Sequence, residues 1–480
     1  MTTSHGDAID AIEPRYQALK PELQQFLIRL SVFRCGWTRE AAEQVGNQPP
    51  ALDARESLTE LVNRSLLIVE SPSGEQRWRM SPAVRDFGLG RLGAAKESIA
   101  ERHADYFFSL AEQARSQLMG AEQRSWLDRL NLEHDNLRAA LDHYRDRESA
   151  ASQELALAVN LARFWNHGSW PEGKEKLQHA LERQPPGDSA PKAHGLAWLG
   201  FLSYRLDHFE FAKQALSESA MMSRQLDDQE SLAFSLHSLG VIAEAQGRHR
   251  EARWLFMESL KIAQEANSAW LIGWAFHGLG IVSETEKDYE AAKACYLMYL
   301  SKSEEVKDLP GIAAALYCLG VIDREQRDYA EARQHLEKSL ALRSELGNKW
   351  GIADCYFDLG LIEEALEGHQ AARAIFQKSL ALRQEIWDRR GIANALEGIG
   401  RVSLALGKDE DAARAFSEVE TIRNSIGEPR PPHGDPHYVP PAFSIKDRFP
   451  SEWREAHEWA LDEGDTGSLV KKSLEKSRKA

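Results

Sequence analysis

Six glycines recur at a constant interval of 40 residues, and this spacing constrains the fold more than any other feature of the 480-residue sequence. Each glycine follows Leu or Ile, an alanine comes twelve residues later, and a large apolar residue comes four residues after the alanine. The glycines are Gly200, Gly240, Gly280, Gly320, Gly360 and Gly400. A period of this length indicates stacked structural repeats that share one continuous core.

The spacing predicts two antiparallel helices in each repeat, for example over residues 232–246 and 249–266. A glycine on the first helix and an alanine on the second let the two backbones approach closely. The large residue four positions after the alanine lies on the same helical face, so it fills the space between the helices. We therefore predict a mainly α fold built from helical hairpins.

The pattern Leu-x-x-Leu-Gly followed by Ala-x-x-x-Phe resembles the tetratricopeptide repeat (TPR) in a longer, 40-residue form. The resemblance covers residues 193–426, and a divergent unit over about 153–184, with Gly168, Trp170 and Gly173, is counted as a seventh repeat. It implies a right-handed superhelix over residues 153–426 whose concave groove binds a protein or peptide segment.

In such a groove the ligand contacts first-helix residues that point away from the second helix. The resemblance places thirteen residues there: Phe234, His237, Glu244, Trp274, His277, Glu284, Tyr317, Arg324, Asp354, Phe357, Glu364, Glu397 and Arg401. Aromatic rings among carboxylates suit a ligand with apolar anchors and basic residues. Residues 193–426 carry 26 basic and 36 acidic residues, so the other interpretation, a merely solvated charged face, stays open.

Residues 14–98 follow a different pattern. Apolar spacing predicts helices over 21–33 and 52–63 with a short helix capped by Thr38 between them, then a β-hairpin and a further helix from Pro82. Three helices followed by a hairpin are typical of a winged helix.

Two segments resemble a known family. Leu61-Val62-Asn63-Arg64-Ser65-Leu66-Leu67 is similar to the winged helix that follows the NB-ARC nucleotide-binding domain in bacterial STAND regulators, and Glu133-His134-Asp135-Asn136-Leu137 is similar to the helical linker after it, here over 99–152. In that family a nucleotide-binding core with a phosphate-binding loop precedes the winged helix, whereas about 13 residues precede it in this sequence. The segment from Gly168 to Lys174 has the spacing of such a loop, but Glu175 stands where a hydroxyl should bind magnesium.

Charge and motifs exclude several classes of function. The net charge is −15, and residues 1–98 carry 12 basic and 13 acidic residues, so DNA binding is disfavoured even though the hairpin offers Arg77, Trp78 and Arg79. No catalytic motif occurs, and the four scattered cysteines predict neither disulfides nor a zinc site. We expect no cofactor. With no leader and no long apolar run, we expect a cytoplasmic protein without membrane contact.

The two ends of the chain differ in composition from the rest. Residues 1–13 are predicted to be disordered, 427–450 form a Pro-rich linker, and 451–480 form a helix with a basic tail. Trp453 and Trp459 in that helix either cap the last repeat or dock on another protein.

The sequence therefore predicts a non-enzymatic scaffold, sensor or adaptor that binds a protein partner. One alternative is the sensor half of a split STAND-type regulator that works with a separate NTPase chain. A winged-helix transcriptional regulator is the least favoured alternative.

Overall fold

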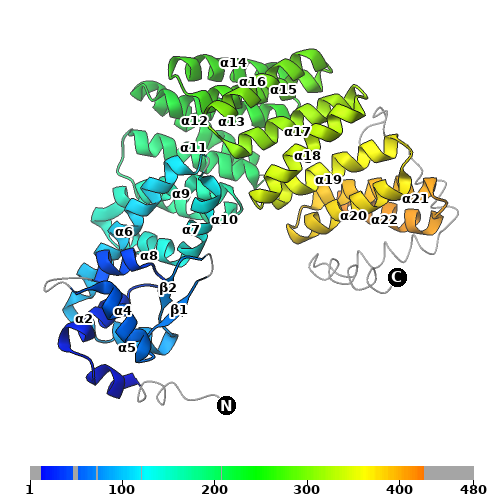
Figure 1. Cartoon of the computed structure of the whole chain (residues 1–480). Helices are drawn as coiled ribbons and strands as arrows, with labels where there is room; N and C mark the ends of the chain where they lie inside the picture. The colour runs from blue at the N-terminus through cyan, green and yellow to red at the C-terminus, as the bar shows by residue number, and fades with distance from the viewer. Residues whose placement is uncertain (1–11, 47–51, 72–73, 121, 207, 426–480) are drawn as a thin grey trace. The chain divides into compact units, whose positions relative to one another are not determined.

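The computed structural model describes residues 12–46, 52–71, 74–120, 122–206 and 208–425 (Figure 1). The chain divides into two compact units, which meet between Gly278 and Leu279, within helix α15. The predicted C-terminal linker and helix lie outside the described residues, as do residues 1–11. Residues 12–17 are helical, and Ile12 is buried in the core of the first unit.

The first unit begins with the predicted winged helix. Its elements are α2 (Pro21–Leu30), α3 (Arg39–Ala41), the π-helical turn Ala42–Gly46, α4 (Ala54–Asn63), strands β1 (Ile68–Glu70) and β2 (Arg77–Arg79), and α5 (Pro82–Leu89). The strands pair antiparallel, with Val69 opposite Trp78. On the other side of β2, Trp37 exchanges two backbone hydrogen bonds of 2.8 and 2.9 Å with Trp78, so the loop before α3 extends the small sheet.

Helix α2 ends three residues before the predicted end at Phe33. The Ser31 hydroxyl donates 2.6 Å to the carbonyl oxygen of Ile28, and the Phe33 N–H bonds to Leu30 in a tight turn. This turn directs the Phe33 ring onto Trp37, with a centroid distance of 4.9 Å and nearly parallel planes.

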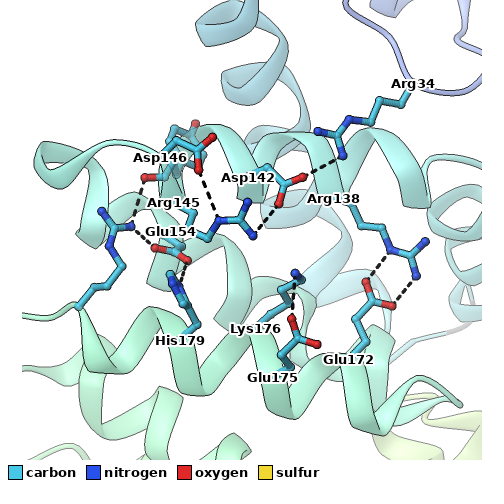
Figure 2. A network of polar contacts seen from close by, with 12 residues as sticks. Arg34, Arg138, Asp142, Arg145, Asp146, Glu154, Glu172, Glu175, Lys176 and His179 are labelled. Carbon is cyan, nitrogen blue, oxygen red and sulfur yellow. Dashed lines mark hydrogen bonds and ion pairs between the residues drawn. The ribbon is translucent and has the colours of Figure 1, made fainter.

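Three helices connect the winged helix to the repeats, and a helical pair follows where the divergent repeat was expected. The connecting helices are α6 (Lys96–Gln117), α7 (Gln123–Leu132) and α8 (His134–Arg145), and the pair is α9 (Ala151–Asn166) and α10 (Trp170–Glu182). Figure 2 shows how α8 is tied to this pair: Arg138 donates two hydrogen bonds, 2.8 and 2.7 Å long, to the Glu172 carboxylate on α10.

Six helical hairpins follow and confirm the predicted repeat. The first helices are α11 (Ala190–Arg205), α13 (Gln229–Ala245), α15 (Ala269–Thr285), α17 (Leu309–Glu325), α19 (Lys349–Ala365) and α21 (Arg389–Ala405). The second helices are α12 (Phe209–Leu226), α14 (His249–Glu265), α16 (Tyr289–Glu305), α18 (Tyr329–Glu345), α20 (His369–Glu385) and α22 (Asp409–Ser425).

The repeating glycines pack as the sequence predicts. A Cβ atom at Gly240 would lie 2.6 Å from the Phe256 ring, and one at Gly360 would lie 2.6 Å from the Phe376 ring. Gly398 of the following repeat faces the other side of Phe376, 2.9 Å from a hypothetical Cβ. Each ring is therefore clamped between backbones, and any larger residue at these glycines would push the helices apart.

The second helices add a hydrogen bond that repeats along the chain. Ser219, Ser259, Ser339 and Ser379 each donate to the carbonyl oxygen 26 residues earlier on the first helix, over 2.7–2.8 Å. Because these hydroxyls are fully buried, the bond satisfies a polar group that would otherwise be costly inside the core.

A left-handed residue follows a repeat helix every 20 residues. From residue 227 onward these are Asp227, Gly247, Asn267, Lys287, Lys307, Arg327, Gly347, Glu367, Trp387 and Gly407, with φ between 51° and 73°. The next N–H closes the turn on the carbonyl five residues back, as from Arg248 to Ala243 over 2.8 Å. This geometry caps the helix C-terminus. Three of these ten residues are glycine, which adopts this conformation without steric cost.

Candidate protein-binding surface

All thirteen predicted groove residues lie on the first helices α13, α15, α17, α19 and α21. Ten of them are partly exposed, whereas Phe234, His237 and Asp354 are buried. The two units surround these residues with different neighbours, and each unit is described by itself.

In the first unit the predicted face is an aromatic cluster. The Phe234 ring centroid lies 4.8 Å from that of Trp198, 5.5 Å from Phe201 and 6.0 Å from Trp274. Phe201 on α11 also reaches Trp274 on α15, 5.7 Å away, across the intervening helix α13. Phe234 is therefore enclosed by rings from both neighbouring first helices, and Trp274 is the predicted aromatic that retains exposed surface.

Two histidines of this face have lowered pKa values. Burial lowers the pKa of His237 to about 3 and that of His277 to about 4, so both rings are neutral at neutral pH. The His237 ring lies 5.1 Å from Trp274 and 5.3 Å from Phe256. Packing accounts for the His237 position, and Glu244 is the predicted acidic residue that remains partly exposed in this unit.

In the second unit the same face is built from paired charges. The buried Asp358 accepts a hydrogen bond of 2.7 Å from the Tyr317 hydroxyl, and it forms an ion pair of 3.1 Å with Arg324. Glu284 accepts 2.6 Å from the Tyr296 hydroxyl, and burial raises the pKa of the Glu284 carboxyl. Asp358 was absent from the predicted set although it holds two of its members in place.

The predicted carboxylates of α19 and α21 are paired with arginines. Arg401 donates two hydrogen bonds of 2.8 Å to Glu364, and Arg423 donates one of 2.5 Å to Glu397. Asp354 accepts a hydrogen bond of 2.7 Å from Arg383. Burial raises the pKa of Asp354 to about 6, although the Arg383 guanidinium acts in the opposite direction. The acidic character expected for this face is therefore largely neutralised by neighbouring helices.

Sequence reasoning missed three arginines on the second helices that share one repeat position. Arg343, Arg383 and Arg423 lie 40 residues apart near the ends of α18, α20 and α22. Arg343 and Arg383 are buried, and Arg343 donates 2.6 Å to the carbonyl oxygen of Gly351. Their period was visible in the sequence and could have indicated a repeating arginine contact.

The wing of the winged helix presents one of the two basic residues that the sequence offered, Arg79, and buries the other, Arg77. Arg77 is buried in an ion pair of 2.6 Å with the equally buried Glu133 of the linker, and Trp78 is buried as well. Arg79 pairs with Glu70 across the hairpin. Arg77 and Trp78 are therefore not available on the wing, because they are buried, whereas Arg79 keeps 42% of its side chain exposed beside Glu70.

A buried amide completes the joint between the winged helix and the linker. The side chain of Asn136 on α8 accepts a hydrogen bond of 2.9 Å from the Arg34 backbone N–H and donates one of 3.2 Å to the carbonyl oxygen of Gly36. It also donates 2.7 Å to Glu133, the partner of Arg77. These hydrogen bonds link buried polar groups of the winged helix and the linker, and they hold the winged helix to α8.

Among the described residues, no group of three or more His, Cys, Asp or Glu side chains is placed to hold a metal ion. Gly173, in the segment with phosphate-loop spacing, lies inside α10, where a Cβ would be 2.7 Å from Trp165. Across the same described ranges, no helix has the length and apolar character needed to cross a membrane.

Comparison with solved structures finds similar helical folds. A Rap protein complexed with competence and sporulation factor has a TM-score of 0.50 at 13% identity, over 69% of this chain and 99% of that chain. A STAND protein with a tetratricopeptide repeat sensor, from Pyrococcus horikoshii, has a TM-score of 0.48 at 15% identity, over 89% of this chain and 66% of that chain.

Sequence comparison identifies both modules. Curated relatives from Mycobacterium tuberculosis and Mycobacterium bovis, named as HTH-type transcriptional regulators, are 30% identical over 240 residues. This match spans 46% of the chain and 26% of the relatives, so the chain covers about a quarter of their length. Residues 19–92 match the winged helix-turn-helix domain and residues 311–385 match the tetratricopeptide repeat. The chain therefore joins an N-terminal winged helix-turn-helix domain to a TPR solenoid.

Proposed function

We propose that this chain is a non-enzymatic sensor or adaptor that binds a protein or peptide segment on the exposed side of its first helices. One contrast between repeat positions carries the proposal. The helix-packing position is glycine in all six repeats, whereas the position occupied by Tyr317 holds His237, His277, Phe357 and Glu397 in neighbouring repeats. Four of these five residues, all but His237, are partly exposed, and a variable, partly exposed position on a uniform scaffold is typical of a recognition surface.

The side chains on this face favour a ligand with apolar and charged anchors. Trp274 and Phe357 keep exposed aromatic surface for an apolar anchor. Glu364 and Glu397 are about one fifth exposed, so a basic ligand residue could compete there with Arg401 and Arg423. The Rap protein of similar fold was solved with a bound factor, and we extend that kind of recognition to this chain.

A charge exchange tests this surface with little disturbance of the fold. The double variant Glu364→Arg with Arg401→Glu keeps an ion pair inside the protein but reverses the charges that a ligand meets. In affinity purification from the native cell with mass spectrometry, we expect the wild-type chain and the control Trp254→Ala to recover the same partner, and the exchange variant to lose it at unchanged thermal stability. Recovery of that partner by the exchange variant would contradict the proposal.

We propose that the winged helix is a packing module and not a DNA reader, in agreement with the buried Arg77–Glu133 pair. The names of the mycobacterial relatives favour the opposite view. An electrophoretic mobility shift at moderate salt separates the two, because phosphate contacts would give a salt-sensitive shift and we expect none. Reconstitution with an NB-ARC chain would test the remaining alternative, the split regulator.

A further inference from the structure

Two exposed tryptophans lie at the end of the second unit where second helices turn into first helices. Trp350, near the start of α19, is 44% exposed, and Trp387, between α20 and α21, is 57% exposed. Lys349 and Glu385 form an ion pair of 2.7 Å, so the segments that carry the two tryptophans are in contact. Arg389 and Arg390 follow and are exposed. We call Trp350, Trp387, Arg389 and Arg390 the tryptophan end.

Trp387 is the single aromatic residue among the ten left-handed residues that follow repeat helices from residue 227 onward. Its φ of 58° is left-handed, and the equivalent residue one repeat earlier is Gly347, with φ of 67°. Glycine adopts this conformation without the steric cost that a side chain incurs. A tryptophan that accepts this cost while leaving most of its ring in solvent adds little to the core. Its surface is therefore best explained by a contact outside the unit.

The opposite end of the same helices has complementary character. Each of the four turns from first to second helix carries three carboxylates and at most one basic residue: Glu286, Asp288 and Glu290; Glu325, Asp328 and Glu331; Glu363, Glu364 and Glu367; Asp409, Glu410 and Asp411. Among the third group stands Leu366, which is 52% exposed. We call these twelve carboxylates and Leu366 the acidic end. Five of the twelve also form ion pairs within the unit: Glu325, Glu331, Glu363, Glu364 and Asp411.

We propose that the tryptophan end of one copy of this chain docks on the acidic end of a second copy. The tryptophan rings would cover Leu366, and Arg389 and Arg390 would meet the surrounding carboxylates.

The geometry dictates how such copies would join. Trp350 stands at the start of α19 and Leu366 directly follows its end, and the 17 residues of this helix span about 25 Å. The two surfaces thus lie at opposite ends of one helix and cannot meet within the unit. Copies join head to tail, so the contact forms rings or open chains and not a symmetric pair.

Sedimentation equilibrium of the full chain tests the contact. We expect an average mass that rises above the monomer value of 54.1 kDa as concentration increases from micromolar to sub-millimolar, and that falls at high salt. Trp387→Gly should return the mass to the monomer value without lowering the thermal unfolding temperature. The control Trp254→Ala removes a ring with the same 57% exposure on α14 and should associate as the wild type does.

Charge exchange identifies the two surfaces. The variant Arg389→Glu with Arg390→Glu, and the variant Glu367→Arg with Gln370→Arg, should each be monomeric alone. An equimolar mixture should associate again, because the intact tryptophan end of the second variant then meets the intact acidic end of the first, and the two altered ends also carry opposite charges. A wild-type chain that stays monomeric throughout, association that survives either double variant or Trp387→Gly, or a mixture that stays monomeric would overturn the proposal. So would vesicle binding or a heterologous protein that occupies the tryptophan end in place of a second copy.

Discussion

Phe234 and Asp354 occupy the same repeat position, 120 residues apart, and both are buried, yet one stands in an aromatic cluster and the other in an ion pair. The difference follows from a second position. Arg383 holds the Asp354 carboxylate, whereas the residue equivalent to Arg383 in the repeat of Phe234 is Ala263. The repeat thus tolerates either an apolar pair or an ion pair at these two positions, provided that both residues are of the same kind.

This pairing has a physical basis. A buried carboxylate is tolerated when a cation and hydrogen bonds replace its water, and an aromatic ring is favoured when other rings surround it. In the first unit, Trp198, Phe201 and Trp274 supply such rings. In the second unit, arginines reach the first helices from α18, α20 and α22. The two faces differ because each position was matched to its own neighbours.

The largest effect is expected when a carboxylate replaces the buried ring of the aromatic cluster, where Ala263 stands in place of the arginine that would pair with it. Phe234→Asp removes a buried ring, which costs about 3–5 kcal/mol by itself, and adds a carboxyl group without a cation. The free energy of unfolding from urea titration should fall by at least that range. Phe234→Leu is the matched control and should cost less because it keeps most of the apolar volume. A loss below about 1 kcal/mol for Phe234→Asp would mean that Phe234 is not enclosed.

The next largest effect is expected from acidification, which should destabilise the first unit more than the second. In the first unit, burial lowers the pKa of His103, His194 and His237 to about 3. Between pH 6.5 and 4 the unfolded chain therefore binds more protons than the folded unit, so the stability of this unit decreases as the pH is lowered. In the second unit, burial raises the pKa of Asp354 to about 6, so its protonation favours the folded state over the same interval.

Hydrogen–deuterium exchange at pH 7 and pH 5, corrected for intrinsic rates, measures this difference. We expect protection to fall more in helices α6, α11 and α13 than in α17 and α19. Equal loss in both groups of helices would show that the buried histidines do not control acid sensitivity. The variant His237→Gln gives an internal check, because it should reduce the response of the first unit.

Features set by local spacing could be predicted from the sequence. The contact of Gly240 with Phe256 follows from two residues sixteen positions apart on adjacent helices, and the structure has it in all six repeats. The winged helix was equally accessible, because its caps, hairpin and apolar faces are local signals. Both depend on backbone geometry that a short segment determines by itself.

Features set by more distant neighbours could not be predicted. Phe234 became buried because rings from α11 and α15 close over α13, and this depends on how tightly successive first helices approach. Arg77 looked available to DNA because its partner Glu133 is 56 residues further along the chain. The turns at Lys287 and Arg327 carry no glycine, so no residue type indicated their left-handed backbone.

A smaller effect should follow from the ionic face of the second unit. Asp358→Asn removes the charge that pairs with Arg324 and weakens the acceptor of the Tyr317 hydroxyl. Loss of one buried polar partner costs about 1–3 kcal/mol, and urea titration should show a decrease in that range. The exposed control Asp328→Asn should change the free energy of unfolding by less than about 0.5 kcal/mol. Equal effects of the two changes would mean that the Asp358 pairing adds no stability.

The smallest effect compares equivalent turns of the two units. Gly247 and Arg327 both cap a first helix with left-handed backbone, φ 73° and 65°. A Cβ at Gly247 would meet no atom within 4 Å, so Gly247→Ala isolates the backbone cost and should lower stability by about 1 kcal/mol. Arg327→Gly relieves that cost but gives the unfolded chain more freedom, so its net effect should stay within about 0.5 kcal/mol. Thermal unfolding followed by circular dichroism resolves the two, and a neutral Gly247→Ala would mean that this turn can abandon its left-handed geometry while the repeats on either side remain folded.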